Sequence, residues 1–110
     1  MGLLKLTYLR LQKRRRVVGF MPSRLYSADF RQQYFCRPLD VSQHGIGIFT
    51  EDELSEKGDE FVFVLENYVI RLVRVFSLEN PGLKVGFRHG FKVKDQTIDL
   101  EQLCIDLGYL

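Results

Sequence analysis

The chain is poor in the residues from which metal sites and disulfide frameworks are most often built. It has two cysteines and two histidines in 110 residues. Cys36 and Cys104 form no C-x-x-C pair and nothing else indicates secretion, so we expect two reduced thiols in apolar surroundings. His44 and His89 belong to no metal-ligand or nucleophile–base pattern. We therefore expect no metal cofactor and no disulfide scaffold.

Long apolar runs and catalytic motifs are also missing. No segment approaches the roughly 20 apolar residues that a membrane-spanning helix needs. The start, MGLLKLTYLR, precedes its basic cluster and has no small-residue cleavage site, so it is a poor signal peptide. The sequence contains no H-E-x-x-H, G-x-S-x-G or G-x-x-x-x-G-K-[ST]. We expect a cytoplasmic protein that is not an enzyme.

What the chain does have is an uneven charge. Residues 1–38 hold nine Lys or Arg against one acid, a net +8, whereas residues 39–110 hold seven against thirteen acids, a net −6. The four consecutive cations KRRR at 13–16 repel one another in any regular element, so we expect residues 1–16 to form a flexible basic arm. A basic arm on an acidic body indicates an anionic partner.

From residue 17 onward the pattern is mostly β. Short β-prone segments separated by turn signals fall at 17–21, 23–27, 32–39, 45–49, 61–65, 68–76 and 83–89. No long helical pattern lies between them, which favours an antiparallel barrel or sandwich over βαβ units. We expect Arg71 and Arg74 to line a polar surface and Gly47 to relieve crowding in a bent strand.

The last segment changes to a helical period. Over 97–110 the apolar residues recur near helical spacing, with Thr97 or Asp99 available as an N-terminal cap and Gly108 as a terminator. We therefore expect one C-terminal helix, in the same domain, packed on a β body that spans residues 17–96.

Two motifs occur in a fixed order. Arg10 and Arg14 have R-x-x-x-R spacing, with Arg15 and Arg16 following. Asp40, Ser42 and Gly45 then give D-x-S-x-x-G directly before the alternating GIGIF. Together with the later strands, a VGF near the end and a final helix, this order resembles the PilZ domain family, bacterial receptors for cyclic di-GMP, over nearly the whole chain.

The resemblance implies a small antiparallel six-stranded β-barrel with a C-terminal helix, and cyclic di-GMP as the ligand. It implies that the binding residues are Arg10, Arg14, Arg15, Arg16, Asp40, Ser42 and Gly45. With no output domain, the arm would order over the barrel rim and signal to an effector protein, for example in motility or exopolysaccharide machinery.

The chemistry of these residue types suits such a ligand. The guanidinium fork of arginine matches the O6/N7 edge of guanine and the oxygens of phosphate, and it stacks on flat rings. Asp40 can accept from the N1–H and N2–H₂ edge of guanine, and Ser42 can donate or accept. Gly45 permits positive φ and a close backbone approach.

Three frames of the arginine motif remain open. Arg10 with Arg14 keeps the literal spacing. Arg16 directly precedes the first β-prone segment, but Gln12 then stands where the first arginine is wanted. Lys13, Arg14 and Arg15 acting together give a third frame. If Gln12 holds the first position, binding would be weak or absent.

Two other functions also fit the pattern. One is a PilZ-like adaptor that works only by protein contact and binds no nucleotide. The other is nucleic-acid binding by the arm on a β-barrel platform, although the acidic body and the lack of an aromatic stacking strand argue against it. The sequence does not specify oligomeric state, stoichiometry or pathway.

Overall fold

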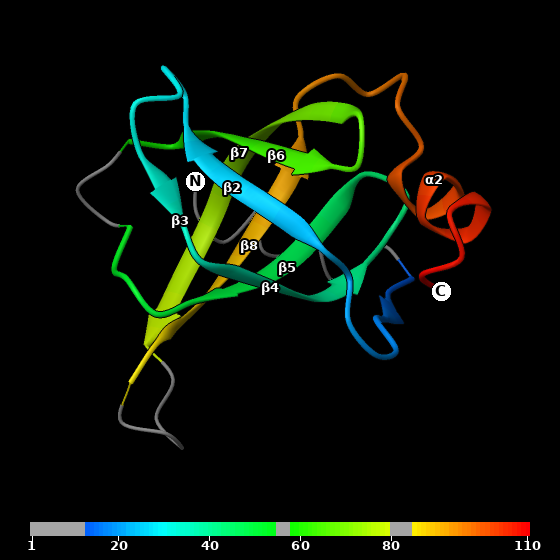
Figure 1. Cartoon of the computed structure of the whole chain (residues 1–110), viewed down its shortest axis with the longest axis horizontal. Helices are drawn as coiled ribbons and strands as arrows, with labels where there is room; N and C mark the ends of the chain where they lie inside the picture. Colours follow the sequence, from blue (N-terminus) through cyan, green and yellow to red (C-terminus); the bar gives the residue numbers. More distant parts are fainter. Residues whose placement is uncertain (1–12, 55–57, 80–84) are drawn as a thin grey trace.

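The computed structural model describes residues 13–54, 58–79 and 85–110. They form eight strands and one helix: β1 Arg15–Arg16, β2 Ser23–Ser27, β3 Gln33–Tyr34, β4 Cys36–Val41, β5 Gly45–Thr50, β6 Glu60–Leu65, β7 Tyr68–Glu79, β8 Phe87–Val93 and α2 Leu100–Asp106. All the strands belong to one antiparallel sheet in the order β1-β4-β5-β8-β7-β6-β2-β3 (Figure 1).

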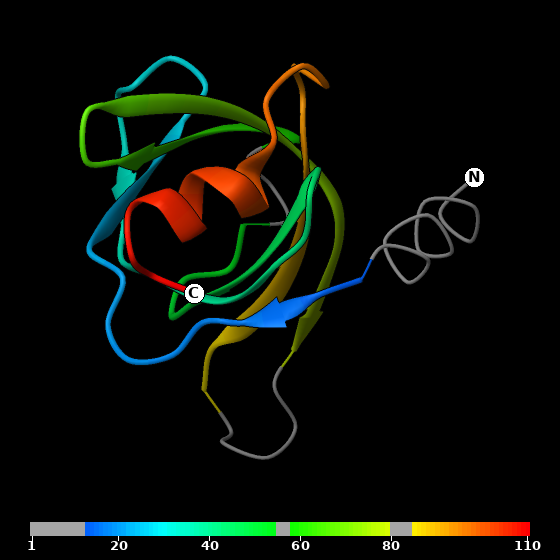
Figure 2. The same cartoon turned by 90° about the vertical axis from the view of Figure 1, so that its right-hand side faces the viewer.

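The predicted mainly β fold with a C-terminal helix is confirmed, but the closed six-stranded barrel is wrong. Six strands have five or more residues, and β1 and β3 add two residues each at the two ends of an open ladder. The sheet nevertheless curves around its core (Figure 2). Phe35 alone separates β3, which pairs with β2, from β4, which pairs with β5, so one stretch of chain serves both ends of the sheet.

The concave side of the sheet holds the apolar core. β-Branched and aromatic residues at alternate positions of the strands turn their side chains inward. Phe61 and Phe91 meet edge to face with ring centroids 5.6 Å apart, and Tyr34 packs on Phe61 at 6.2 Å. Burial of these large side chains, each worth about 1.5–3 kcal/mol, is the main stabilising contribution to the fold.

The helix α2 covers one end of the curved sheet (Figure 2). Its Leu100 and Cys104 are fully buried in the core. Asp99 is the N-terminal cap and accepts a 2.9 Å hydrogen bond from the Gln102 amide, while Gly108 adopts φ +85° just beyond the end. These two predicted helix limits are confirmed. In the described part of the chain, no helix has the length and apolar character needed to cross a membrane.

The strand β4 contains a bulge at Leu39. Pro38 pairs with Ile48, but Asp40 pairs with Gly47 and Val41 with Ile46, so one extra residue lies on β4. Val41 and Ile46 are fully buried, whereas Asp40 lies on the opposite, outward-facing side with Gly47. The bulge therefore sets which residues of β4 reach the surface.

The predicted basic arm is partly incorporated into the sheet. Arg15 pairs with Val41 and Arg16 with Asp40, so β1 forms an edge strand although it consists of two cations. For Arg15 and Arg16 the prediction of a flexible arm is wrong, because both lie in a strand. The neighbouring Arg14 and Arg15 form ion pairs with Asp40 and Glu101, which offset part of the repulsion within the cation run. Residues 1–12, including Arg10 and Gln12, lie outside the described residues.

Candidate functional site

The two sequence motifs meet at Asp40. The side chain of Arg14 forms an ion pair with Asp40 Oδ1, and the side chains of both residues are mostly buried, with 22% and 16% exposed. The contact follows from the pairing of β1 with β4, which places Arg16 directly opposite Asp40. Residues that lie 26 positions apart in the sequence are thus neighbours in the fold.

A third arginine reaches the same carboxylate from β8. Arg88 Nη2 donates to Asp40 Oδ2 at 2.8 Å. No sequence motif indicated Arg88, because its position relative to Asp40 depends on the β5–β8 register, which no local pattern reveals. The Asp40 carboxylate therefore bridges two arginines, with Arg14 at Oδ1 and Arg88 at Oδ2.

Gly47 makes room for this bridge. It pairs with Asp40 across the β4–β5 ladder, and a Cβ on residue 47 would lie 2.6 Å from Asp40 Oδ1. Without a side chain at 47, the carboxylate lies across β5 toward β8 and meets Arg88. The expectation that Gly47 relieves crowding is confirmed, and the crowding group is the site carboxylate itself.

A cavity of about 310 Å³ opens beside Asp40. We call it the arginine cavity; Arg16, Arg37, Asp40 and Arg88 line it, together with Gly19 and Leu39. Three arginines face one carboxylate, so the lining carries two net positive charges. Arg37 and Gly19 belong to neither sequence motif. Only the excess of basic residues in the first third of the chain indicated Arg37, and no sequence signal indicated Gly19.

The remaining predicted residues lie elsewhere. Arg15 points away from Asp40, as strand alternation requires, and its Nε is 3.5 Å from Glu101 Oε2 on α2. Ser42 is 1% exposed, and its backbone amide and hydroxyl both donate to the Gly45 carbonyl, at 2.9 and 3.4 Å. Ser42 and Gly45 thus form the tight turn between β4 and β5, and neither lines the arginine cavity.

Gly45 lies in β5 opposite Lys92, and it is not among the residues with positive φ. The positive φ that glycine permits is therefore not used at this position. Gly19, beside the arginine cavity, does have φ +78°. A direct role of Ser42 or Gly45 in ligand binding stays a prediction.

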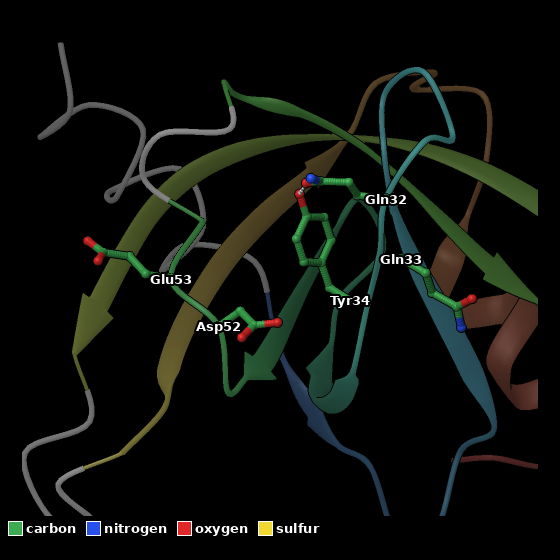
Figure 3. A pocket seen from close by; sticks show the side chains of 5 residues that line it. All are labelled: Gln32, Gln33, Tyr34, Asp52 and Glu53. Atoms are coloured by element: carbon green, nitrogen blue, oxygen red, sulfur yellow. Dashed lines mark hydrogen bonds between the residues drawn. The ribbon is translucent and has the colours of Figure 1, made fainter.

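A second hollow has the opposite electrostatic character. It has a volume of about 570 Å³ and lies at β3 and the segment after β5, where Figure 3 shows the side chains of Gln32, Gln33, Tyr34, Asp52 and Glu53. The Tyr34 hydroxyl donates to Gln32 Oε1 at 2.6 Å. Burial and the charge of Asp52 raise the pKa of Tyr34, so it stays protonated. Two carboxylates make this hollow unfavourable for an anion.

A buried polar chain runs through the sheet at His89. Thr50 Oγ1 donates to the Asp52 carbonyl, so it accepts from His89 Nε2 at 2.7 Å, and His89 Nδ1 accepts from Ser77 at 2.7 Å. Burial, and then the charge of Arg74, lower the pKa of His89 to about 4. The neutral ring is therefore a structural element of the sheet.

Arg74 and the two cysteines are also structural. Arg74 is only 8% exposed. Its Nη2 donates a 2.5 Å hydrogen bond to the Gly58 carbonyl oxygen, and its guanidinium carbon lies 5.5 Å from the centroid of the Phe61 ring. The prediction that Arg74 lines a polar surface is therefore wrong. Cys36 is half-buried and Cys104 is buried, both as free thiols, as predicted. Burial raises the pKa of Cys104 to about 11, which makes it a poor nucleophile.

Comparison of the chain with protein-family models, with curated proteins and with solved structures finds no match. The residues around Asp40 are therefore the basis for a functional proposal.

Proposed function

We propose that this chain is a PilZ-type receptor for cyclic di-GMP, without catalytic activity, that binds its ligand on the face around Asp40. The observation that carries the proposal is the ion pair between Arg14 and Asp40. It joins the basic segment to the D-x-S-x-x-G segment, and these are the two motifs on which the sequence resemblance depends. The contact supports the two frames that include Arg14.

The charges and donors around Asp40 suit a cyclic dinucleotide. Such a ligand carries two phosphodiester charges, and the arginine cavity carries two net positive charges. The guanidinium groups supply donor forks for phosphate or for the O6/N7 edge of guanine. Asp40 has about four lone-pair positions, so it can accept from the guanine N1–H and N2–H₂ edge while it holds an arginine. Charged hydrogen bonds of this kind contribute about 1.5–3 kcal/mol each.

Isothermal titration calorimetry with cyclic di-GMP tests the proposal. We expect saturable binding near 1 μM, about −8 kcal/mol, and no detectable heat for Arg14→Ala or Asp40→Ala. Arg31→Ala is the matched control, because Arg31 lies in the turn between β2 and β3 and its side chain is 86% exposed. Circular dichroism would check that each variant keeps its β fold. Wild-type protein that gives no heat with cyclic di-GMP would contradict the proposal.

A second candidate is an adaptor that acts through protein contact alone. Val18 and Phe20 lie in the segment between β1 and β2 beside the arginine cavity, and they are 78% and 82% exposed. Exposed apolar side chains next to a binding face are typical of contact surfaces. Under the main proposal, the same residues would pass the signal to an effector protein. Guanine-specific heat in the titration would exclude the adaptor that binds no nucleotide.

A further inference from the structure

The strand ladder places two arginines outside the sequence motifs on the same face as Asp40. Arg37 on β4 and Arg88 on β8 are both cross-strand partners of Phe49 on β5. Cross-strand partners share a face, so both arginines flank Phe49 on one side of the sheet. Asp40 and Gly47 form the next pair along the same face.

The distance between the two arginines allows them to bind one group together. Their backbones are separated by two strand spacings, roughly 9–10 Å. Arg88 already spans a comparable distance, because its Nη2 crosses β5 and meets Asp40 on β4 at 2.8 Å. The bond to Asp40 therefore holds the Arg88 guanidinium at the arginine cavity, which Arg37 also lines.

The donors of these arginines remain available for a ligand. Among the described residues, no carboxylate lies within 4.0 Å of the Arg16 or Arg37 guanidinium. Arg88 uses one of its five N–H donors on Asp40. Three arginines line this cavity, and two of them have no carboxylate partner within the part of the chain that the structure describes. Such a lining favours an anion with several oxygens, and phosphate is the group that guanidinium forks match best.

We propose that Arg37 and Arg88, together with Arg16, form a phosphate-binding subsite that takes one phosphodiester group of a cyclic dinucleotide. The identity of the ligand rests on the proposed function, whereas the phosphate chemistry of the subsite follows from the cavity. Its volume of about 310 Å³ is at the lower end of the range for small-molecule sites. The cavity therefore holds one end of the ligand, and Arg14 and Asp40 are left to bind a guanine.

The test compares Arg37→Ala and Arg88→Ala with Arg31→Ala by titration with cyclic di-GMP. We expect each of the first two variants to weaken binding at least tenfold and the control to stay within twofold of wild type. Wild-type affinity in both variants would overturn the subsite and leave the proposed function standing. Thermal unfolding by circular dichroism would check that the variants are folded.

A second titration keeps the two proposals separable. Inorganic pyrophosphate is added to ¹⁵N-labelled protein, and the arginine Nε–Hε signals are followed by NMR. In one outcome, wild type does not bind cyclic di-GMP, but pyrophosphate shifts the signals of Arg16, Arg37 and Arg88. If Arg37→Ala also abolishes the pyrophosphate-induced shifts of Arg16 and Arg88, the phosphate subsite is supported and the proposed function is contradicted. If neither cyclic di-GMP nor pyrophosphate binds wild type, both proposals fall.

Discussion

The carboxylate of Asp40 occupies space that a side chain on Gly47 would require: a Cβ at residue 47 would lie 2.6 Å from Asp40 Oδ1. The two residues pair across β4 and β5, and the carboxylate carries the ion pairs to Arg14 and Arg88. The absence of one side chain thus positions the central acid of the candidate site.

Gly47→Ala should uncouple Asp40 from Arg14 while the fold remains stable. The added methyl group displaces only the end of a flexible side chain, so we expect the free energy of unfolding to fall by less than about 1 kcal/mol. The coupling energy between Asp40 and Arg14, from a double-mutant cycle by urea unfolding, should be about 1 kcal/mol in wild type and near zero in the Gly47→Ala background.

The matched control for this cycle is the Asp40→Ala background, where Gly47→Ala meets no carboxylate and should have almost no effect. An Asp40–Arg14 coupling that is unchanged by the methyl group would show that Gly47 does not position the acid.

The pH dependence of stability should report on His89. The ring is neutral in the folded state, with a pKa of about 4, whereas an unfolded histidine has a pKa near 6.5. Below pH 6.5 the unfolded chain binds a proton that the folded chain does not, so stability falls as the pH drops from about 6.5 to 4 and then levels off. The pKa difference corresponds to about 3 kcal/mol.

This prediction is checked by urea unfolding between pH 8 and pH 4 for wild type and His89→Gln. Glutamine keeps hydrogen-bonding groups at the position but has no proton to gain, so its curve lacks the contribution of residue 89. Identical pH slopes for the two proteins would mean that His89 does not titrate as its burial requires.

Loss of the N-terminal cap at Asp99 should destabilise α2, whose Leu100 and Cys104 pack in the core. Asp99→Ala removes the acceptor of the Gln102 amide and should lower the free energy of unfolding by about 1 kcal/mol. Asp99→Asn is the control, because asparagine caps about as well and should stay close to wild type. Thermal unfolding measures the stability of both variants. If Asp99→Ala and Asp99→Asn lose the same stability, the effect comes from the charge of Asp99 and not from its hydrogen bond to the Gln102 amide.

Local signals predicted the helix and most strands because their causes are local. Asp99 and Gly108 mark the two ends of α2. A side chain that caps the first amides and a glycine that adopts positive φ serve these roles through local backbone geometry, so both can be read from the sequence. Alternating apolar residues likewise predicted β5, and the apolar segment 61–65 predicted β6. The ion pair between Arg14 and Asp40 joins the two motifs that the sequence singled out. The ligand of these motifs stays a prediction for binding experiments to test.

Long-range register explains what the sequence could not predict. Arg88 and Arg37 join the candidate site because both pair with Phe49, and this pairing depends on the turns and bulges of three strands. Arg74 looked like a surface residue in an alternating strand, but it is buried because the Gly58 carbonyl and the Phe61 ring offer it partners. The open eight-stranded ladder arises from the short edge strands β1 and β3, which are too brief to leave a periodic signal.

The extra residue at Leu39 has a consequence for how the chain tolerates change in length. If the same residues paired without the bulge, Asp40 would stand opposite Ile46 and point into the apolar core, while Val41 would turn toward solvent. Deletion of Leu39 would instead remove only the extra residue and leave Asp40 opposite Gly47 and Val41 opposite Ile46. A one-residue deletion at the bulge should therefore keep the acid outside and the valine inside.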